Sequence, residues 1–255
     1  MEKDTGEKYR PVRRMTEAER IRTVREIFST VTGKYDFLNH LLSLRRDIQW
    51  RRFTVQRMRF FRTQRLLDVA TGTADLAVEA CRRNPSLQAT GVDFVQPMLD
   101  AGLKKVLAKG LLTRVHLLLG DALALPFPDA SFDVAAIAFG IRNIPDRPGA
   151  LREMKRVIVP GGQVMVLEMT FPRKRFLDRL YHLYLGRILP VIARIFSRNP
   201  AAYHYLADSI MSFPSPEEFS REMEKVGLVC VKKYRLDFGI TNLHVGLKEQ
   251  QGRHS

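Results

Sequence analysis

Hydrophobic and polar residues alternate along the chain in two ways, and the change falls near residue 65. Before it the pattern is helical: Val24, Ile27 and Phe28 repeat at the spacing of one helix face, and a further helix is expected around Trp50. After it, short apolar runs alternate with amphipathic segments. This second pattern is typical of a parallel sheet whose strands are connected by helices.

The second region is predicted to contain seven strands and four connecting helices. The expected strands are Leu66–Ala70, Ala89–Val92, Val115–Leu119, Val134–Phe139, Gln163–Glu168, Val229–Leu236 and Leu243–Leu247. The expected helices are Asp75–Arg83, Pro97–Lys109, Pro148–Val159 and Glu217–Val226, with Asp146 as the cap of the third. The last two strands look like a hairpin-type pair. The sequence therefore predicts an α/β, Rossmann-like fold: a mostly parallel seven-stranded sheet with helices on both faces.

Two helical segments are predicted outside this alternation. Residues 1–64 are expected to form a basic helical cover at the N-terminus, and residues 65–255 the core. Within the core, a basic and aromatic helical insertion over residues 173–212 precedes the last two strands. Both segments are expected to belong to one structural domain.

The net charge of +15 is concentrated outside the predicted core. Residues 1–65 hold 17 basic and 8 acidic side chains, and residues 173–198 hold 7 basic and 1 acidic, whereas the rest of the chain is balanced. Such patches attract anionic lipid headgroups or nucleic acid, although two solvated basic faces without a partner would look the same. Because the chain has no RNA-binding motif, we expect an anionic membrane surface and no nucleic acid. The sequence leaves a homo-oligomer open.

Cysteine content and apolar segments indicate the compartment. Cys81 and Cys230 are too few for a disulfide scaffold or a zinc site, so both are expected to be buried thiols and no metal is expected. Residues 1–25 are charged and lack the apolar core of a signal peptide. The most apolar helical stretch, Leu180–Phe196, is interrupted by His182, Gly186 and arginines. We expect a cytoplasmic protein, peripheral on the inner face of the membrane.

The turn after the first predicted strand carries the candidate cofactor chemistry. It reads LLDVATGTADL over Leu66–Leu76. Gly72 can adopt the positive φ of a tight turn, and Thr73 offers a hydroxyl and an amide at the start of the following helix. Ala70 and Ala74 stand where a G-x-G-x-x-G motif has glycine, which disfavours a pyrophosphate. The turn therefore favours a cofactor without phosphates.

Acidic residues follow the next two predicted strands. Asp93 can accept hydrogen bonds from two ribose hydroxyls. Asp121 can accept from an adenine amino group, and the Ala122 amide can donate to a ring nitrogen. Each feature alone is weak, since an aspartate at a strand end is often a helix cap. Together and in this order they predict S-adenosylmethionine bound by Gly72, Thr73, Asp93, Asp121 and Ala122.

Longer stretches extend this pattern to a family. They include Tyr35–Asn39 (YDFLN), Leu67–Leu76, Gly120–Ala122, Phe139–Asn143 (FGIRN), Pro160–Gly162, Tyr203–Ile210 (YHYLADSI) and His244–Lys248. Over about residues 24–248 the chain resembles class I S-adenosylmethionine methyltransferases. Within them it closely resembles the ubiquinone/menaquinone biosynthesis C-methyltransferase family, which includes demethylmenaquinone methyltransferases. Ala138 departs from the serine that the family can have there, and Ser43–Asp47 lacks the usual glycine and histidine.

The resemblance implies an enzyme that methylates a ring carbon of a prenylated quinol. The step would convert demethylmenaquinol to menaquinol, or serve ubiquinone biosynthesis, or both. An aromatic carbon attacks a methyl group well only when a neighbouring hydroxyl loses its proton, so a cation near that oxygen would assist. Arg142 could stabilise the phenolate, with Asn143 orienting the same oxygen. Arg142 could equally form a structural pair with a carboxylate such as Asp146.

Other residues and other functions stay open. Tyr35, Asp36 and Asn39 could close the pocket or cap a helix. His40, His182, His204 and His244 are candidate bases, each more often surface or structural. The alternatives are a methyltransferase of another lipophilic small molecule, a nucleic-acid methyltransferase, and a non-catalytic S-adenosylmethionine-binding subunit of a quinone-biosynthesis complex.

Overall fold

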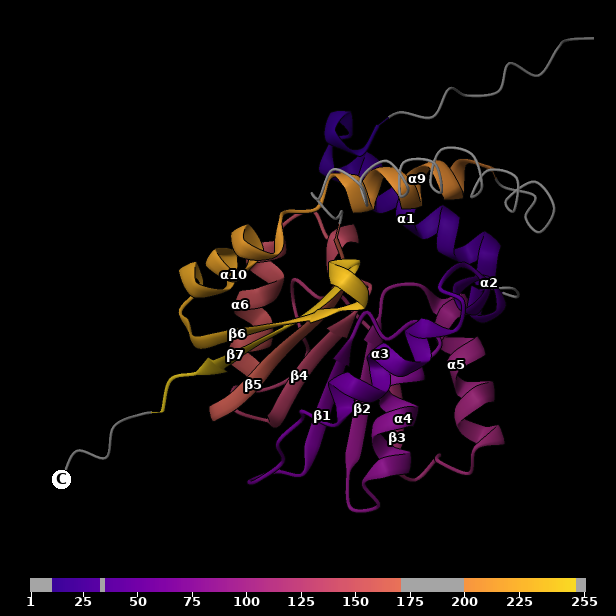
Figure 1. The fold of residues 1–255 in the computed structure, drawn as a ribbon. Coiled ribbons are helices and arrows are strands. Elements are labelled where there is room, and N and C mark those ends of the chain that lie inside the picture. The colour runs from indigo at the N-terminus through magenta and orange to yellow at the C-terminus, as the bar shows by residue number, and fades with distance from the viewer. Residues whose placement is uncertain (1–10, 33–34, 171–199, 251–255) are drawn as a thin grey trace, which may run out of the picture.

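The computed structural model describes residues 11–32, 35–170 and 200–250 of the 255-residue chain (Figure 1). Within these residues a seven-stranded sheet has the order β3-β2-β1-β4-β5-β7-β6. The strands are β1 Arg65–Val69, β2 Gln88–Asp93, β3 Val115–Leu119, β4 Phe132–Ala138, β5 Ile158–Met169, β6 Leu228–Leu236 and β7 Thr241–Lys248. Strand β7 is antiparallel to β5 and β6, and the other pairs are parallel. The predicted sheet is confirmed.

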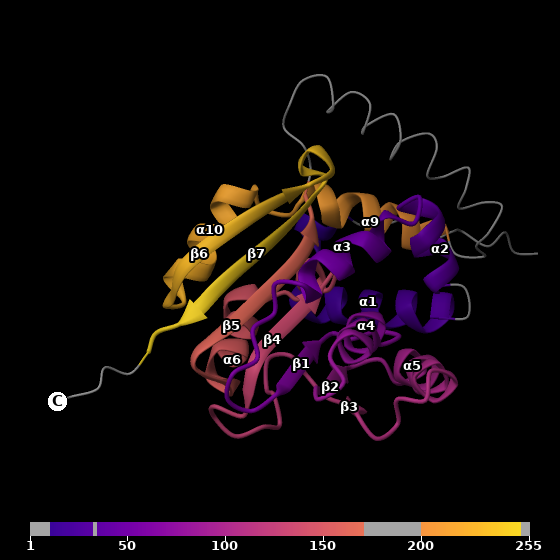
Figure 2. The same ribbon diagram turned by 60° about the horizontal axis from the view of Figure 1, so that its bottom comes forward.

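Helices cover both faces of this sheet. The helices are α1 Glu17–Val31, α2 Tyr35–Leu42, α3 Arg46–Val55, α4 Asp75–Arg83, α5 Gln96–Ala108, α6 Arg147–Val157, α9 Pro200–Met211 and α10 Pro216–Lys225. Short turns of 3-10 helix are η1 Val12–Arg14, η3 Ile141–Asn143 and η5 Asp237–Gly239. Helices α6 and α10 lie on one side, and α3, α4 and α5 on the other (Figures 1 and 2). Helices α1 and α9 lie across the carboxyl edge of the strands.

Most element boundaries follow local signals in the sequence. Helix α4 spans the predicted residues, and α6 begins where Asp146 accepts a hydrogen bond from the Gly149 amide (2.9 Å). Helix α6 ends at Val157, two residues before Val159, the predicted end of the helix. The reason is that the backbone becomes extended at Ile158, which pairs with Phe132 on β4.

The sheet separates two hydrophobic cores. Neighbouring side chains of a strand point to opposite faces, so the fully buried Leu66 packs with α4 and Leu67 with α6. Since both faces are covered, the parallel strands appear in the sequence as continuous apolar runs rather than as alternating ones.

The two segments outside the core are described in part. The predicted N-terminal helices appear as α1, α2 and α3, with Val24 and Ile27 buried as expected. The end of the predicted insertion forms α9. Residues 171–199, including the predicted apolar face from Leu180 to Phe196, lie outside the described residues. Among the described residues, no helix combines the length and apolar character that crossing a membrane requires.

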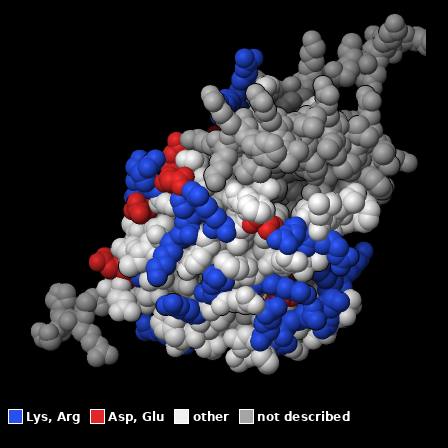
Figure 3. Space-filling model, viewed as in Figure 1, with Lys and Arg blue, Asp and Glu red and all other residues white. Residues whose placement is uncertain are grey.

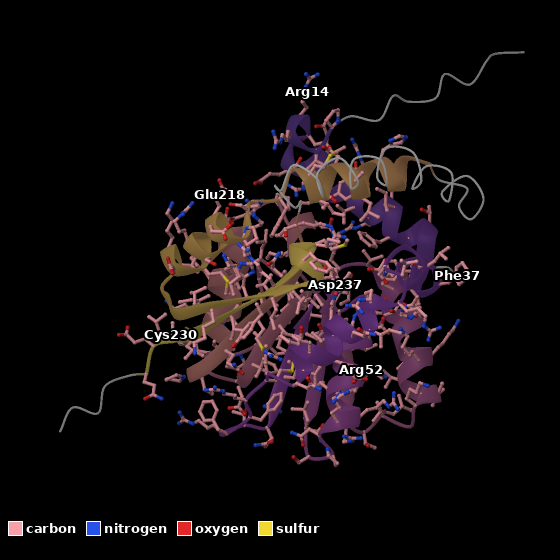
Figure 4. The ribbon with its side chains drawn as sticks, viewed as in Figure 1. Arg14, Phe37, Arg52, Glu218, Cys230 and Asp237 are labelled. Carbon is pink, nitrogen blue, oxygen red and sulfur yellow. The ribbon has the colours of Figure 1, made fainter. Side chains whose placement is uncertain are left out.

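The prediction for the cysteines was half right. Cys81 is buried, but Cys230 is exposed, so its expected burial was wrong (Figure 4). Cys230 lies on the edge strand β6, where the pairing with β7 shifts register between Val229 and Lys232. An edge strand has a neighbour on one side only, and an apolar pattern does not reveal which strand becomes the edge.

Candidate functional site

A cavity of about 330 Å³ opens at the carboxyl ends of β1 to β4. This is where ligands bind on open α/β sheets, beside the point at which the strand order reverses. The sheet side of the cavity includes Ala70, Gly72, Asp93, Phe94, Asp121, Ala122, Phe139 and Asn143. The opposite wall includes Ile21, Val24, Arg25 and Phe28 of α1, and Tyr35 of α2. The structure therefore brings the N-terminal cover and the sheet together around one space.

The turn between β1 and α4 forms the floor of the cavity. Ala70, Gly72 and Ala74 all have left-handed backbone, with φ of 51°, 57° and 65°. Such backbone costs energy in alanine and persists where its surroundings hold it. Asp68 supplies part of that support, because its Oδ2 accepts from the Thr71 hydroxyl (2.7 Å) and the Ala77 amide (3.2 Å). Burial raises the pKa of Asp68 to about 7.

Asp93 lies at the end of β2 and lines the cavity, as predicted. Its Oδ2 accepts from the Gly72 amide (2.8 Å) and its Oδ1 from the Val95 amide (3.0 Å). Burial raises its pKa, and the backbone donors oppose that effect. Each carboxylate oxygen has a further lone pair, so Asp93 can still accept from ligand hydroxyls.

Asp121 and Ala122 line the cavity beyond β3. The Asp121 Oδ1 accepts from the Leu123 amide (2.9 Å), which closes the turn after the strand. Asp121 is exposed whereas Asp93 is buried. The two carboxylates therefore flank the cavity on adjacent strands, with the deeper one nearer Gly72.

The Thr73 hydroxyl faces another set of groups. It donates to Asp36 Oδ1 (2.6 Å) and accepts from Lys105 Nζ (2.9 Å), and Thr73 is not part of the cavity wall. The structure thus brings Gly72, Asp93, Asp121 and Ala122 together on the cavity and leaves the Thr73 side chain beneath it. Asp36, one of the residues that could have closed the pocket, bonds to Thr73 instead.

Aromatic residues of the cover give the cavity its apolar side. Phe28 and Tyr35 meet edge to face, with ring centroids 5.7 Å apart, and the Arg25 guanidinium lies 5.6 Å from the Phe94 ring centre. Burial raises the pKa of Tyr35, partly offset by a hydrogen bond with Asn39. The sequence pattern predicted the amphipathic face of α1, but not that this face would cover the cavity.

Arg142 lies behind the cavity wall. Its guanidinium forms a buried ion pair with Glu168 at the end of β5 and donates to the Phe139 carbonyl (2.8 Å). The Arg142 amide donates to the same carboxylate (3.2 Å). The carboxylate partner is therefore Glu168, while Asp146 caps α6. Glu168 was not identified from the sequence as the partner of Arg142. Its position at the end of a predicted strand was the one signal that could have indicated it.

Asn143 lines the cavity and is held from behind by Tyr205 of α9. The Tyr205 hydroxyl donates to Asn143 Oδ1 (3.2 Å), and burial raises the Tyr205 pKa. Arg20 of α1 donates to the Arg142 carbonyl, and its charge partly offsets the effect of burial on Tyr205. Helices α1 and α9 thus meet η3 at this end of the cavity.

The described histidines lie away from the cavity wall. The His40 Nδ1 lies 2.9 Å from Asp47 Oδ2, and the buried His244 Nε2 lies 3.0 Å from the Pro216 carbonyl. His204 is exposed, and His182 lies outside the described residues. Across the described part of the chain, no group of His, Cys, Asp and Glu could hold a metal ion.

The residues present fit S-adenosylmethionine. Asp93 ends β2 and Asp121 follows β3. Gly72, with positive φ, follows the neighbouring strand β1 and lets the backbone approach a ligand beside them. A methyl group at Gly72 would lie 3.3 Å from Met98 Cε and 3.9 Å from Tyr35 Cε1. Both Met98 and Tyr35 line the cavity. The volume is within the range usual for small-molecule sites.

Comparison with known proteins identifies relatives over most of the chain. The model of the ubiE/COQ5 methyltransferase family matches residues 15–248. The ubiquinone/menaquinone biosynthesis C-methyltransferase UbiE of Geotalea uraniireducens is 43% identical over 226 residues, which are 88% of this chain and 96% of the relative. The demethylmenaquinone methyltransferase of Thermus thermophilus is 43% identical over 220 residues, 86% of this chain and 99% of the relative.

Solved structures share the fold. The phosphoethanolamine N-methyltransferase 2 of Haemonchus contortus, in complex with S-adenosyl-L-methionine, superposes with a TM-score of 0.58 at 17% identity. The match covers 78% of this chain and 52% of that one. At this identity the likeness concerns the fold alone, and it agrees with the Rossmann-like sheet described above.

Proposed function

Since the chain belongs to the ubiE/COQ5 methyltransferase family, we propose that it methylates a ring carbon of a prenylated quinol. It is an S-adenosylmethionine-dependent C-methyltransferase. Its relatives are named as enzymes of ubiquinone/menaquinone biosynthesis or as demethylmenaquinone methyltransferases. The acceptor is accordingly a demethylmenaquinol, a methoxy-polyprenyl benzoquinol, or both. The observation that carries the proposal is one cavity lined both by the carboxylate of Asp93, which is placed to accept from ribose hydroxyls, and by the side-chain amide of Asn143.

In this proposal the cofactor lies along the carboxyl ends of β1 to β3. Gly72 leaves room for it, Asp93 accepts from its ribose hydroxyls, and Asp121 and Ala122 recognise its adenine. When bound, S-adenosylmethionine supplies a methyl group on a positively charged sulfonium. Thr73 contributes from beneath, by fixing the turn through Asp36 and Lys105.

Asn143 orients the acceptor. Because the Tyr205 hydroxyl donates to its Oδ1, its Nδ2 group is left to donate to an oxygen in the cavity. A quinol oxygen held there gains negative charge as the neighbouring ring carbon attacks, and a fixed donor stabilises that charge. Arg142 acts as a positioning residue: its pair with Glu168 holds η3, and with it Asn143, against the cavity.

The surroundings of the acceptor favour its ionised form. Arg25 lines the cavity, and Arg20 reaches the carbonyl of Arg142 from the same helix. Nearby positive charge lowers the pKa of a phenol. The apolar cover of Val24, Phe28 and Tyr35 excludes water, which strengthens these electrostatic effects.

A peripheral position on the cytoplasmic face of the membrane completes the proposal. A polyprenyl tail keeps the acceptor in the lipid, so the enzyme has to meet it at the bilayer surface. Figure 3 shows Lys and Arg side chains gathered on the face over α3 and α4. Such a face suits anionic headgroups, to which each exposed basic residue adds about 1 kcal/mol.

The test is methyl transfer from labelled S-adenosylmethionine to chemically reduced acceptors in detergent. The panel holds a demethylmenaquinol, a methoxy-polyprenyl benzoquinol and a fatty acid. We expect label on a quinol ring carbon, and its distribution between the two quinols identifies the branch. Label on the fatty acid alone, or none on either quinol while cofactor binding is intact, would overturn the proposed substrate.

Two variants in the same assay test the role of Asn143. Tyr205→Phe removes one hydrogen bond, worth about 1 kcal/mol, so kcat should fall about fivefold while the KM for S-adenosylmethionine stays unchanged. Tyr234→Phe is the matched control, because Tyr234 packs against Phe53 and neither residue lines the cavity. If Tyr205 acts through Asn143, adding Tyr205→Phe to Asn143→Ala causes no further loss. A further fivefold decrease of kcat in the double variant, relative to Asn143→Ala alone, would contradict this role.

A further inference from the structure

Leu44 and Phe238 are the two most exposed large hydrophobic side chains among the described residues, at 82% and 89%. Leu44 lies in the turn between α2 and α3, and Phe238 lies in η5, between β6 and β7. Single exposed apolar residues are common on protein surfaces. These two differ because side-chain hydrogen bonds connect the turns that carry them, and we call the pair the apolar tip.

The Asp237 carboxylate connects the two turns through hydrogen bonds. The Arg46 guanidinium donates to both oxygens of its carboxylate (Nε to Oδ2, 2.7 Å), and the Trp50 indole donates to Oδ2 (2.7 Å). Arg46 follows Leu44 by two residues, and Asp237 directly precedes Phe238. In Figure 4, Asp237 lies at the end of the hairpin, beside α3. Turns almost two hundred residues apart, one with Leu44 and the other with Phe238, are thus connected.

The backbone of both turns is held in an unfavourable conformation. Leu44 and Arg45 have φ of 51° and 62°, and Asp237 and Phe238 have φ of 45° and 59°. Left-handed backbone is rare in bulky residues and occurs where the surrounding structure imposes it. The Arg46–Asp237 contact lies within two residues of both Leu44 and Phe238 and connects the two turns.

The apolar tip lies on the same edge of the sheet as the cavity. Strand β7 begins at Thr241 opposite Met169, the carboxyl end of β5, so η5 belongs to that edge. The Trp50 ring lies 5.9 Å from the ring of Phe139, which lines the cavity. Trp50 therefore touches the cavity wall on one side and the support of the apolar tip on the other.

Arginine side chains lie near the apolar tip. Arg45, Arg46 and Arg235 are exposed. Arg46 pairs with Asp237, and Arg235, on the strand that leads to η5, pairs with Glu217. Figure 3 shows further Lys and Arg on this face, over α3 and α4. Exposed apolar side chains with basic residues beside them match an anionic lipid surface, where the apolar side chains enter the acyl region and basic side chains such as Arg45 meet phosphates.

We infer that the apolar tip of Leu44 and Phe238 inserts into an anionic bilayer and sets the cavity against the lipid from which the acceptor comes. This inference rests on the proposed function, in which the acceptor carries a lipid-soluble tail. It assigns the membrane contact to two turns of the described chain, supported by Asp237.

The test compares two double variants in vesicle sedimentation. Leu44→Ser with Phe238→Ser removes the apolar tip. Leu107→Ser with Phe61→Ser is the matched control, since these residues are also exposed but lie toward the amino edge of the sheet. With phosphatidylglycerol–phosphatidylcholine vesicles, we expect the first variant to partition about tenfold more weakly than the natural chain, and the control within about twofold of it.

A second measurement uses Trp50, the single tryptophan of the chain. Vesicles with brominated acyl chains should quench its fluorescence in the natural chain and in the control, but not in the Leu44→Ser, Phe238→Ser variant. Equal cofactor affinity and melting temperature would establish that all three chains are folded. Vesicle binding by the tip variant equal to that of the natural chain would overturn the inference. The inference would also be overturned if the tip variant lost self-association but kept vesicle binding. That result would mean that the apolar tip contacts a second copy of the chain.

Activity toward a short-tailed, water-soluble quinol separates this inference from the proposed function. If the natural chain methylates that quinol and the tip variant does so equally, while only the variant fails with vesicle-borne quinol, both proposals are supported. If no quinol is methylated but vesicle binding depends on the apolar tip, the proposed function fails and the docking surface stands.

Discussion

At the residue scale, the cofactor turn depends on one glycine. Gly72 has φ of 57°, its amide donates to Asp93, and a Cβ there would point at Met98 and Tyr35. Position 72 therefore requires a residue that tolerates positive φ and, in the proposed site, one without a side chain that would occupy the space of the cofactor. The two requirements can be separated, because Gly110 has φ of 65° with nothing within 4 Å of its Cβ position.

Gly72→Ala is expected to weaken S-adenosylmethionine binding about tenfold or more and to lower the free energy of unfolding by ~1 kcal/mol. The added methyl group both strains the turn and occupies ligand space. Calorimetric titration and denaturant unfolding measure the two effects. Gly110→Ala should show the same loss of stability with unchanged cofactor affinity. Equal affinities in the two variants would refute the placement of the cofactor over Gly72.

The predicted site residues differ in their position relative to the cavity. Gly72, Asp93, Asp121 and Ala122 line the cavity because each follows a parallel strand, and parallel strands end at one edge. Thr73 and Arg142 lie just outside it, since their side chains are bound by Asp36 and Glu168. These partners are 37 and 26 residues away in the sequence. No local pattern indicates contacts of that range.

At the element scale, an ion cluster joins α2 to α5 beneath the cofactor turn. Lys105 Nζ lies 2.7 Å from Asp36 Oδ2, donates to Thr73, and pairs with Asp75. Arg51 of α3 adds a longer contact with Asp75 (3.6 Å). The cluster connects the N-terminal cover to the turn between β1 and α4. With the cofactor placed over this turn as proposed, we expect the position of the cover and cofactor binding to be coupled.

Lys105→Met should therefore speed cofactor dissociation about fivefold, by weakening the attachment of α2. The ion pairs are partly exposed, so each contributes only ~1 kcal/mol, and 0.5 M salt should reduce the difference. Stopped-flow release of the cofactor measures the rate. Lys104→Met, on the exposed neighbouring position, is the control. A Lys105→Met rate equal to that of the control would mean that the cluster does not hold the cover.

At the scale of the whole molecule, His244 makes global stability depend on pH. It is buried between β7 and α10, where its ring meets Phe219 at 5.1 Å, and burial lowers its pKa to about 4 from 6.5. Between these values the unfolded chain binds a proton that the folded chain does not. The free energy of unfolding therefore falls as the pH falls from 6.5 toward 4.

This histidine should contribute about 3 kcal/mol to the stability lost by pH 4. In His244→Asn, an amide can still donate to the Pro216 carbonyl but does not titrate. The decrease in unfolding free energy between pH 7 and 4.5 should be ~2 kcal/mol smaller than in the natural chain. His116→Asn, on an exposed position of β3, should keep the natural pH dependence. The same slope in all three chains would contradict the assignment to His244.

The sequence by itself determined the sheet, its helices and the strand-end chemistry. Periodicity, caps and turn glycines act within a few residues of the chain, so α4, β3 and the positions of Gly72 and Asp93 could be predicted. The Phe139–Asn143 and Tyr203–Ile210 stretches further indicated the family that the comparisons established.

Only the tertiary structure decided which surfaces meet. Helix α1 covers the cavity, Glu168 pairs with Arg142, Cys230 becomes exposed on an edge strand, and Asp237 connects the turns that carry Leu44 and Phe238. Each of these depends on contacts between segments distant in sequence, and many arrangements of the same amphipathic helices would satisfy the local patterns equally well. The close packing of the two cores selects one of them, and that selection assembles the site.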